Sequence, residues 1–95
     1  RILLSSCGGY HSMFYTESKK LYVMGYNKFG QLGTGDNKER LTPYLLMEEE
    51  EIKSICCGGN HSMILKKDGK LFVMGRNAEG QLGLDDNKEK IFQLF

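Results

Sequence analysis

The chain contains one stretch of sequence twice, and this repetition constrains its fold more than any other feature. Residues 7–40 align with residues 57–90 at a constant offset of 50 positions without a gap, and 20 of the 34 aligned pairs are identical. A sequence repeat of this length is typical of small units that bury their apolar surfaces by stacking on one another. We therefore expect an array of similar units, with a first repeat over residues 1–50 and a second over residues 51–95.

The number of repeats bears on whether the array is complete. About three such units are usually needed for a stable array, whereas this chain of 95 residues holds two. We interpret the sequence as a fragment, because it begins at Arg1 rather than Met and stops at Phe95 within the tail of the second repeat. The first repeat can therefore also be incomplete at its N-terminal start. Two units leave outer strands unpaired, so we expect the isolated fragment to be unstable or to oligomerise through its unpaired blade edges.

Each repeat contains four short runs of β-forming residues separated by turn residues. The runs are 2–7, 11–15, 21–24 and 41–47 in the first repeat, and 52–57, 61–65, 71–74 and 91–95 in the second. Asp68-Gly69 lies between two apolar runs, which is a strong hairpin signal. The first repeat has no glycine in the matching residues 16–19, which predicts a looser hairpin. These patterns predict an all-β chain of two four-stranded antiparallel blades of a β-propeller.

Apolar runs and proline refine the position of individual strands. The runs 21–24 and 71–74 contain four consecutive apolar residues each, which predicts strands buried on both faces. Pro43 places the run 41–47 at a sheet edge, because proline cannot donate to a central ladder. Leu32 and Leu82 are expected to anchor the loops that follow the third strands.

Glycine, histidine and asparagine recur at fixed places in both repeats. The shared positions are Gly8, Gly9, His11, Gly25, Asn27, Gly30 and Gly33 in the first copy, and Gly58, Gly59, His61, Gly75, Asn77, Gly80 and Gly83 in the second. Their order is Gly-Gly-x-His-Ser, a strand ending in Gly-x-Asn, and the loop Gly-Gln-Leu-Gly. This order resembles the repeat of the regulator of chromosome condensation family, and the resemblance implies a seven-bladed β-propeller. Met24 and Met74 stand where that family usually has Trp, and Asp85 replaces a glycine.

The resemblance implies two classes of function. The founding activity of the family is nucleotide exchange on the small GTPase Ran with chromatin docking, whereas other members are scaffolds that bind proteins. The two copies align without an inserted wedge, and a net charge of +1 gives no general field for nucleic acid or an anionic membrane. We favour a non-enzymatic scaffold with a protein partner, and keep guanine nucleotide exchange on a small GTPase as the alternative.

No catalytic, cofactor or metal site is expected. Cys7 and His11, like Cys57 and His61, have a spacing that could supply zinc ligands. The motif recurs because the repeat recurs, so a packed cysteine and a histidine hydrogen-bonded to backbone explain it better. A nucleophilic pair would need a unique site and a third, orienting group. The loop 30–38 lacks the Gly-Lys-Ser/Thr ending of a phosphate loop.

The cysteines and the hydropathy bear on the compartment. Three cysteines without a framework spacing predict reduced thiols in an intracellular protein, nuclear or cytoplasmic. A disulfide between Cys7 and Cys57 is the less favoured alternative. No apolar run is long enough to span a membrane.

Candidate partner-binding residues are those at which the two repeats differ, together with an acidic run. Tyr10 and Asn60 occupy the variable position between glycine and histidine, and Tyr26 and Arg76 occupy that between glycine and asparagine. Binding residues favour loops presented by a rigid frame. Four adjacent carboxylates between the repeats could meet a basic partner, although a solvated loop is the plainer interpretation. The candidate set is Tyr10, Tyr26, Glu48, Glu49, Glu50, Glu51, Asn60 and Arg76.

Overall fold

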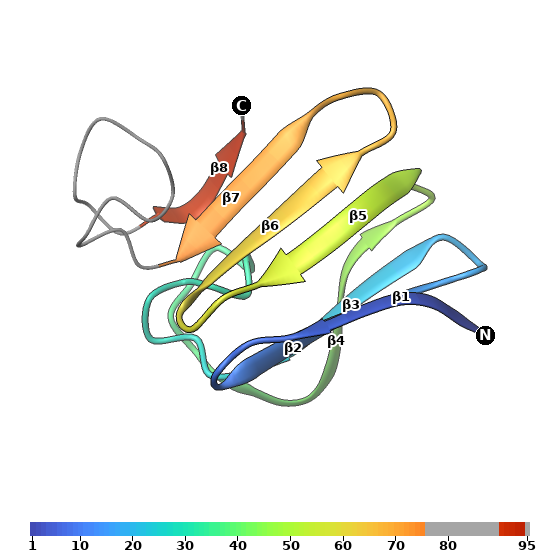
Figure 1. Cartoon of the computed structure of the whole chain (residues 1–95). Coiled ribbons are helices and arrows are strands. Elements are labelled where there is room, and N and C mark those ends of the chain that lie inside the picture. Colours follow the sequence, from blue (N-terminus) through green and yellow to red (C-terminus); the bar gives the residue numbers. More distant parts are fainter. Residues whose placement is uncertain (76–89, 95) are drawn as a thin grey trace.

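The computed structural model describes residues 1–75 and 90–94, which form two β-sheets (Figure 1). The first sheet contains β1 (Ile2–Cys7), β2 (His11–Thr16), β3 (Lys20–Gly25) and β4 (Arg40–Glu48). The second contains β5 (Ile52–Cys57), β6 (His61–Lys66), β7 (Leu71–Gly75) and β8 (Lys90–Leu94). Strands pair antiparallel in chain order, which leaves the Pro43 strand at an edge as predicted. The described residues contain no helix, so the all-β prediction is confirmed.

The second sheet repeats the register of the first. Met13 pairs with Val23 in the first sheet, as Met63 pairs with Val73 in the second. Both sheets also shift register near the start of their first strand, after Ile2 in one and after Ile52 in the other. The repeat in the sequence is therefore a repeat in backbone hydrogen bonding.

The core lies between the two sheets, where β5 packs against β1 and β2 (Figure 1). The first sheet contributes the buried side chains of Met13, Tyr15, Leu21 and Val23. The second sheet contributes Ile52, Ile64 and Met74, and the loop after β3 contributes Leu32. Leu32 is fully buried, which confirms its predicted anchoring role, whereas Leu82 lies outside the described residues.

Burial on both faces, predicted for both third strands, is confirmed for β7 only. Val73 and Met74 are adjacent and both fully buried, because Met74 packs against the first sheet. In β3, Leu21 and Val23 are buried but Tyr22 is half-buried. The Tyr22 side lies away from the second sheet, and the ring stacks there on Phe14 with centroids 5.1 Å apart. The pattern of four apolar residues could not distinguish a strand covered on both sides from one covered on a single side.

The prediction of a looser first hairpin was wrong. The Lys19 amide donates to the Thr16 carbonyl at 3.0 Å, and the Gly69 amide donates to the Lys66 carbonyl at 3.1 Å, so both turns close equally. Lys19 adopts a left-handed φ of 63° at the place where Gly69 has 93°. A lysine can take this disfavoured conformation when its surroundings hold it there, and here its ammonium pairs with Glu51 at 2.6 Å.

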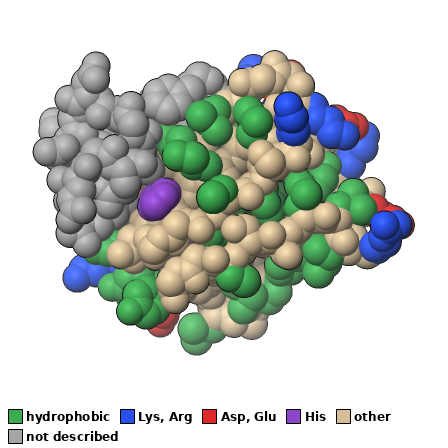
Figure 2. Space-filling model, viewed as in Figure 1, with side chains coloured by type: hydrophobic (Ala, Val, Ile, Leu, Met, Phe, Trp, Pro, Cys, Tyr) green, Lys and Arg blue, Asp and Glu red, His purple; other side chains and the backbone are tan. Residues whose placement is uncertain are grey.

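Loops gather at two opposite ends of the strands (Figure 1). We call one the aromatic end, formed by residues 8–10, 26–39 and 58–60, and the other the charged end, formed by residues 17–19, 49–51 and 67–70. Figure 2 shows Lys, Arg, Asp and Glu side chains gathering mainly toward one end of the visible face. No helix within the described residues is long and apolar enough to cross a membrane.

Candidate functional site

The aromatic end is built on a close approach of the two sheets. The Gly9 amide donates to the Gly58 carbonyl at 3.3 Å, and the Cys57 amide donates to Ser6 Oγ at 3.0 Å. A Cβ atom on Gly8 would lie 2.0 Å from the Gly58 carbonyl oxygen, so only glycine fits there. The Gly-Gly pairs therefore bring the first loops of the two repeats side by side.

A buried hydrogen-bond chain links three segments directly beneath these loops. The Ser62 hydroxyl donates its single hydrogen to the Gln31 carbonyl at 2.6 Å. The His11 Nε2 atom, 2.7 Å from Ser62 Oγ and 3.2 Å from the His61 carbonyl, must then carry the hydrogen and donate. We call this chain of His11, Ser62 and Gln31 the clasp. It joins β2, β6 and the loop that follows β3.

The clasp requires a hydrogen on Nε2 of His11. The other ring nitrogen, Nδ1, has no hydrogen-bond partner within the described residues, which agrees with the neutral ring. His11 is only 4% exposed, and burial lowers its pKa from the usual 6.5, with the bond to the His61 carbonyl opposing that shift. Burial therefore favours the neutral form of His11, which donates a hydrogen bond from one repeat to the other.

The cysteines lie near this region as free thiols. Cys7 and Cys56 are exposed and Cys57 is half-buried. Burial raises the pKa of the Cys57 thiol to about 11, and its Sγ contacts the Ser6 carbonyl at 3.5 Å. Residues 1–75 and 90–94 contain no group of three or more His, Cys, Asp or Glu side chains arranged to hold a metal ion.

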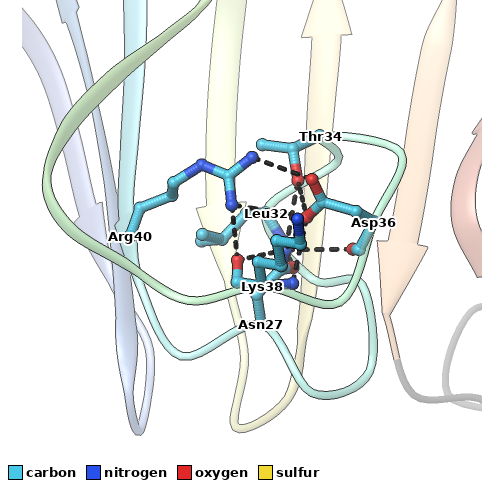
Figure 3. Close-up of polar contacts among 6 residues, drawn as sticks. All are labelled: Asn27, Leu32, Thr34, Asp36, Lys38 and Arg40. Atoms are coloured by element: carbon cyan, nitrogen blue, oxygen red, sulfur yellow. Dashed lines mark hydrogen bonds and ion pairs between the residues drawn. The ribbon is translucent and has the colours of Figure 1, made fainter.

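A second network shapes the loop that follows β3 (Figure 3). The buried Asn27 side chain accepts from the Leu32 amide at 3.0 Å through its oxygen, and its nitrogen donates to the Lys38 carbonyl at 2.9 Å. The same nitrogen lies within 3.2 Å of Asp36 and Thr34 oxygens. Arg40 pairs with Asp36 at 2.9 Å. The hydrogen bond from Arg40 is the main cause that lowers the pKa of Asp36 to about 2. This network fixes the loop path between Tyr26 and β4.

The rigid frame presents an aromatic hollow of about 370 Å³, lined by Tyr10, Tyr26, Phe29 and Asn60. The Tyr26 amide donates to the Tyr10 carbonyl at 2.9 Å, which sets the two tyrosines side by side. Their ring centroids are 5.9 Å apart at 60°, and those of Tyr26 and Phe29 are 6.4 Å apart at 70°. Tyr10 is 71% exposed and Tyr26 36% exposed, so the rings face solvent.

The hollow gathers three of the four variable positions singled out from the sequence. Tyr10, Tyr26 and Asn60 come from both repeats and line one surface, whereas Arg76 lies outside the described residues. Sequence reasoning missed Phe29, although a signal existed, because Phe29 aligns with Glu79 and so is also a position at which the copies differ.

The acidic run lies at the opposite, charged end. Glu48 ends β4, and Glu49 has a left-handed φ of 59°. Glu50 pairs with Lys66 at 2.9 Å, and Glu51 pairs with Lys19 at 2.6 Å and Lys67 at 3.3 Å. The carboxylates of Glu50 and Glu51 are therefore paired with lysines of the same chain, and the four carboxylates do not form one free acidic surface.

The shared motif residues are placed by the same geometry. Gly8, Gly9 and Gly58 lie at the contact between the sheets, and Gly25 and Gly75 have φ of 112° and 114° at the ends of β3 and β7. Gly30 and Gly33 take positive φ in the Asn27 loop, whereas a Cβ on Gly59 would meet nothing within 4 Å. Asn77, Gly80 and Gly83 lie outside the described residues.

Comparison with known families finds two matching models, both described as the regulator of chromosome condensation (RCC1) repeat. One matches residues 20–65, and the other matches residues 6–31 and 52–81. The chain is 41% identical over 58 residues to the human X-linked retinitis pigmentosa GTPase regulator, covering 58% of this chain and 6% of that protein. It is 42% identical over 53 residues to the human probable E3 ubiquitin-protein ligase HERC4, covering 54% of this chain and 5% of that protein.

The fold is similar to that of a solved propeller. The crystal structure of Prp20p from Saccharomyces cerevisiae, described with its binding to Gsp1p and histones, matches with a TM-score of 0.82 at 25% identity. The match covers 99% of this chain and 26% of Prp20p, so the chain spans about a quarter of that structure. The two sheets therefore have the arrangement of neighbouring four-stranded blades in an RCC1-type β-propeller.

Proposed function

The chain belongs to the regulator of chromosome condensation (RCC1) repeat family, and from this premise we propose that its blades serve a protein-interaction scaffold that catalyses no reaction. Residues 1–50 and 51–95 are its two repeat units, and the binding surface is the aromatic hollow. A single observation carries this proposal: positions at which the two copies differ, namely Tyr10, Tyr26 and Asn60, converge on one exposed surface. Among the described residues that the copies share, Gly8, His11, Ser62 and Asn27 hold the loops that carry it.

The composition of the hollow supports a protein ligand. Exposed tyrosines supply large contact area at low conformational cost, and aromatic residues are enriched at the centres of protein interfaces. The charged end supports the proposal less well, because Glu50 and Glu51 already pair with lysines. We also place the protein inside the cell, in the nucleus or cytoplasm, since its described cysteines are free thiols and structural disulfides are typical of secreted proteins.

The test compares proteins captured by the intact protein and by its variants, with quantification by mass spectrometry. Tyr10→Ala with Tyr26→Ala removes the exposed rings, and we expect it to lose specific partners. Tyr44→Ala is the matched control, because Tyr44 is a 40% exposed aromatic residue on β4 that does not line the hollow. Identical partner sets for both variants would contradict the assignment of the surface.

Guanine nucleotide exchange on a small GTPase is the second candidate. The observation that favours it is the similarity to Prp20p, a protein that binds Gsp1p and histones. The rate of release of labelled GDP from a panel of small GTPases, measured with and without the intact protein, separates the two candidates. Acceleration well above the intrinsic rate would favour exchange, and unchanged rates across the panel would favour the scaffold.

The sheet edges lead to an expectation for the 95-residue chain on its own. Edge strands β1 and β4 carry exposed apolar side chains, with Ile2 56% and Leu41 78% exposed. Exposed edges and apolar patches promote association. We expect light scattering to detect oligomers of the isolated chain, and a monomer with a sharp cooperative melt would contradict this.

A further inference from the structure

We propose that the aromatic hollow binds an extended, proline-containing segment of a partner protein. This inference rests on the proposed protein-binding function and adds the chemistry of the ligand. It is carried by three properties of the described lining residues: their lack of charge, their unpaired polar groups and the inclination of their rings.

The first property is charge. The four lining side chains, Tyr10, Tyr26, Phe29 and Asn60, carry no formal charge at neutral pH. The Lys28 ammonium already lies 5.9 Å from the centroid of the Phe29 ring, so a cationic ligand would meet a like charge there. An acidic or phosphorylated ligand would need an arginine cluster, and Arg40 is engaged by Asp36 at 2.9 Å. The four described lining side chains thus supply no charge of their own to pair with a charged ligand, so we take the ligand to be uncharged where it contacts them.

The second property is hydrogen-bonding capacity. The Tyr10 hydroxyl, the Tyr26 hydroxyl and the Asn60 amide make no hydrogen bond to the described part of the chain. Each can donate to a carbonyl oxygen. Polyproline II segments have no internal hydrogen bonds, and proline lacks an N–H group, so such segments present carbonyls without adding many donors that need partners. A proline-containing segment can accept from these donors while bringing few N–H groups of its own that need partners.

The third property is shape. The rings are inclined at 60° and 70° to one another, so they form ridges with gaps rather than one flat stack. Proline-rich segments dock in aromatic-lined grooves of this kind, and their preformed conformation lowers the entropy cost of binding. A volume of about 370 Å³ suits a few residues, near the lower end of the roughly 300–1,000 Å³ range of ligand sites.

The test selects ligands from a random peptide library displayed on phage, using the intact protein as bait. Parallel selections use the Tyr10→Ala/Tyr26→Ala variant and the Tyr44→Ala control. We expect proline-containing peptides to be enriched by the unmodified protein and by Tyr44→Ala, and not by the double variant. Thermal melts of all three proteins check that the exposed substitutions leave the fold intact.

A direct measurement follows with defined probes, a fluorescein-labelled proline decamer and a Gly-Ser decamer, by fluorescence anisotropy. We expect the proline decamer to bind more tightly, Tyr10→Ala to weaken it by about tenfold, as for an aromatic residue at the centre of an interface, and Tyr26→Phe to weaken it less. Equal affinity for both probes would overturn the proposal.

The outcomes of the selection separate the ligand chemistry from the function. Peptides that depend on Tyr10 and Tyr26 but lack proline, whether cationic or aromatic, would overturn the ligand class and leave the protein-binding function standing. Peptides selected equally by the double variant would overturn both the ligand class and the assignment of the hollow.

Discussion

The aromatic end and the charged end are built from the same two repeats but stabilise the molecule in different ways. At the aromatic end, the clasp and the Asn27 network form their hydrogen bonds inside the fold and leave the rings of Tyr10 and Tyr26 exposed. At the charged end, the exposed groups themselves pair, as Glu51 does with Lys19 and Lys67. An end whose stabilising hydrogen bonds lie inside the fold can offer its surface to a partner, whereas an end that pairs its surface groups has less to offer.

The largest expected effect lies at the glycine contact. Gly8→Ala places a Cβ against the Gly58 carbonyl of the other sheet and against the His11 ring, so the sheets must separate. We expect a loss of about 3 kcal/mol or more in the free energy of unfolding, measured by urea denaturation of the intact protein. Gly9→Ala is the matched control, because its Cβ would meet Gly59 oxygen at 3.2 Å and needs a smaller adjustment. Equal losses would show that the contact does not govern how the sheets dock.

The same comparison shows what the sequence could predict. Strands and edges followed from apolar runs, turn residues and Pro43, since these depend on local chemistry. The burial of Met74 but not of Tyr22 depends on which face another sheet covers, and no local pattern encodes that. The first hairpin was wrongly predicted to be looser than the second. An ion pair and neighbouring hydrogen bonds hold Lys19 in a backbone conformation that glycine usually takes.

The candidate site was predictable to a similar degree. The difference between copies identified Tyr10, Tyr26 and Asn60 as residues of interest, but their convergence needed the close contact of the two sheets. The clasp was foreseen only as a histidine bonded to backbone. Its partner Ser62 lies 51 residues away in the chain, and such a long-range pairing leaves no signal in one sequence.

The Asn27 network gives the second effect in size. Asn27→Asp keeps the shape but replaces the donating nitrogen with an anionic oxygen that faces the Lys38 carbonyl and oxygens of Asp36. Burying an unpaired charge in this way costs about 2–3 kcal/mol, which urea denaturation would measure. Asn37→Asp is the exposed comparison: it loses one hydrogen bond, to the Lys28 carbonyl, but its charge stays in water, so it should cost less than Asn27→Asp. The result fails to support the network if both variants unfold alike.

The clasp makes the third prediction, a dependence on pH. Burial lowers the pKa of His11 below its unfolded value of 6.5, so between those two pKa values the unfolded chain binds more protons than the folded one. Stability from neutral His11 is thus fully present above about pH 6.5 and is lost as the pH falls through the folded pKa. The titratable side chain that acts on it electrostatically is His61.

The measurement is urea denaturation at several pH values from 8 to 5 for the unmodified protein and for His11→Gln, which keeps a hydrogen-bond donor but cannot titrate. The free energy of unfolding of the variant should vary less steeply with pH, by up to about 1.4 kcal/mol per pH unit, than that of the unmodified protein. Parallel profiles would mean that His11 binds protons equally in the folded and unfolded states, and would contradict the lowered pKa. Anisotropy with the proline decamer at each pH would report whether the loss of the clasp also weakens the hollow above it.

The smallest effect is expected at the charged end, where it sharpens the contrast with the clasp. Glu51→Gln removes both exposed ion pairs, to Lys19 and to Lys67. In the unmodified protein, hydrogen bonds from these two lysines are the main cause that lowers the pKa of Glu51. Its carboxylate therefore contributes stability above its unfolded pKa of 4.5 and loses it as the pH falls through the folded pKa. Because exposed pairs are screened by salt, the denaturation midpoint of the variant should fall slightly at low salt and match the unmodified protein near 1 M NaCl.

Buried Ser62→Ala, by contrast, should remain destabilised at every salt concentration, because the clasp is shielded from ions. If salt restored Ser62→Ala as well, the distinction between an internally satisfied end and a surface-paired end would not hold.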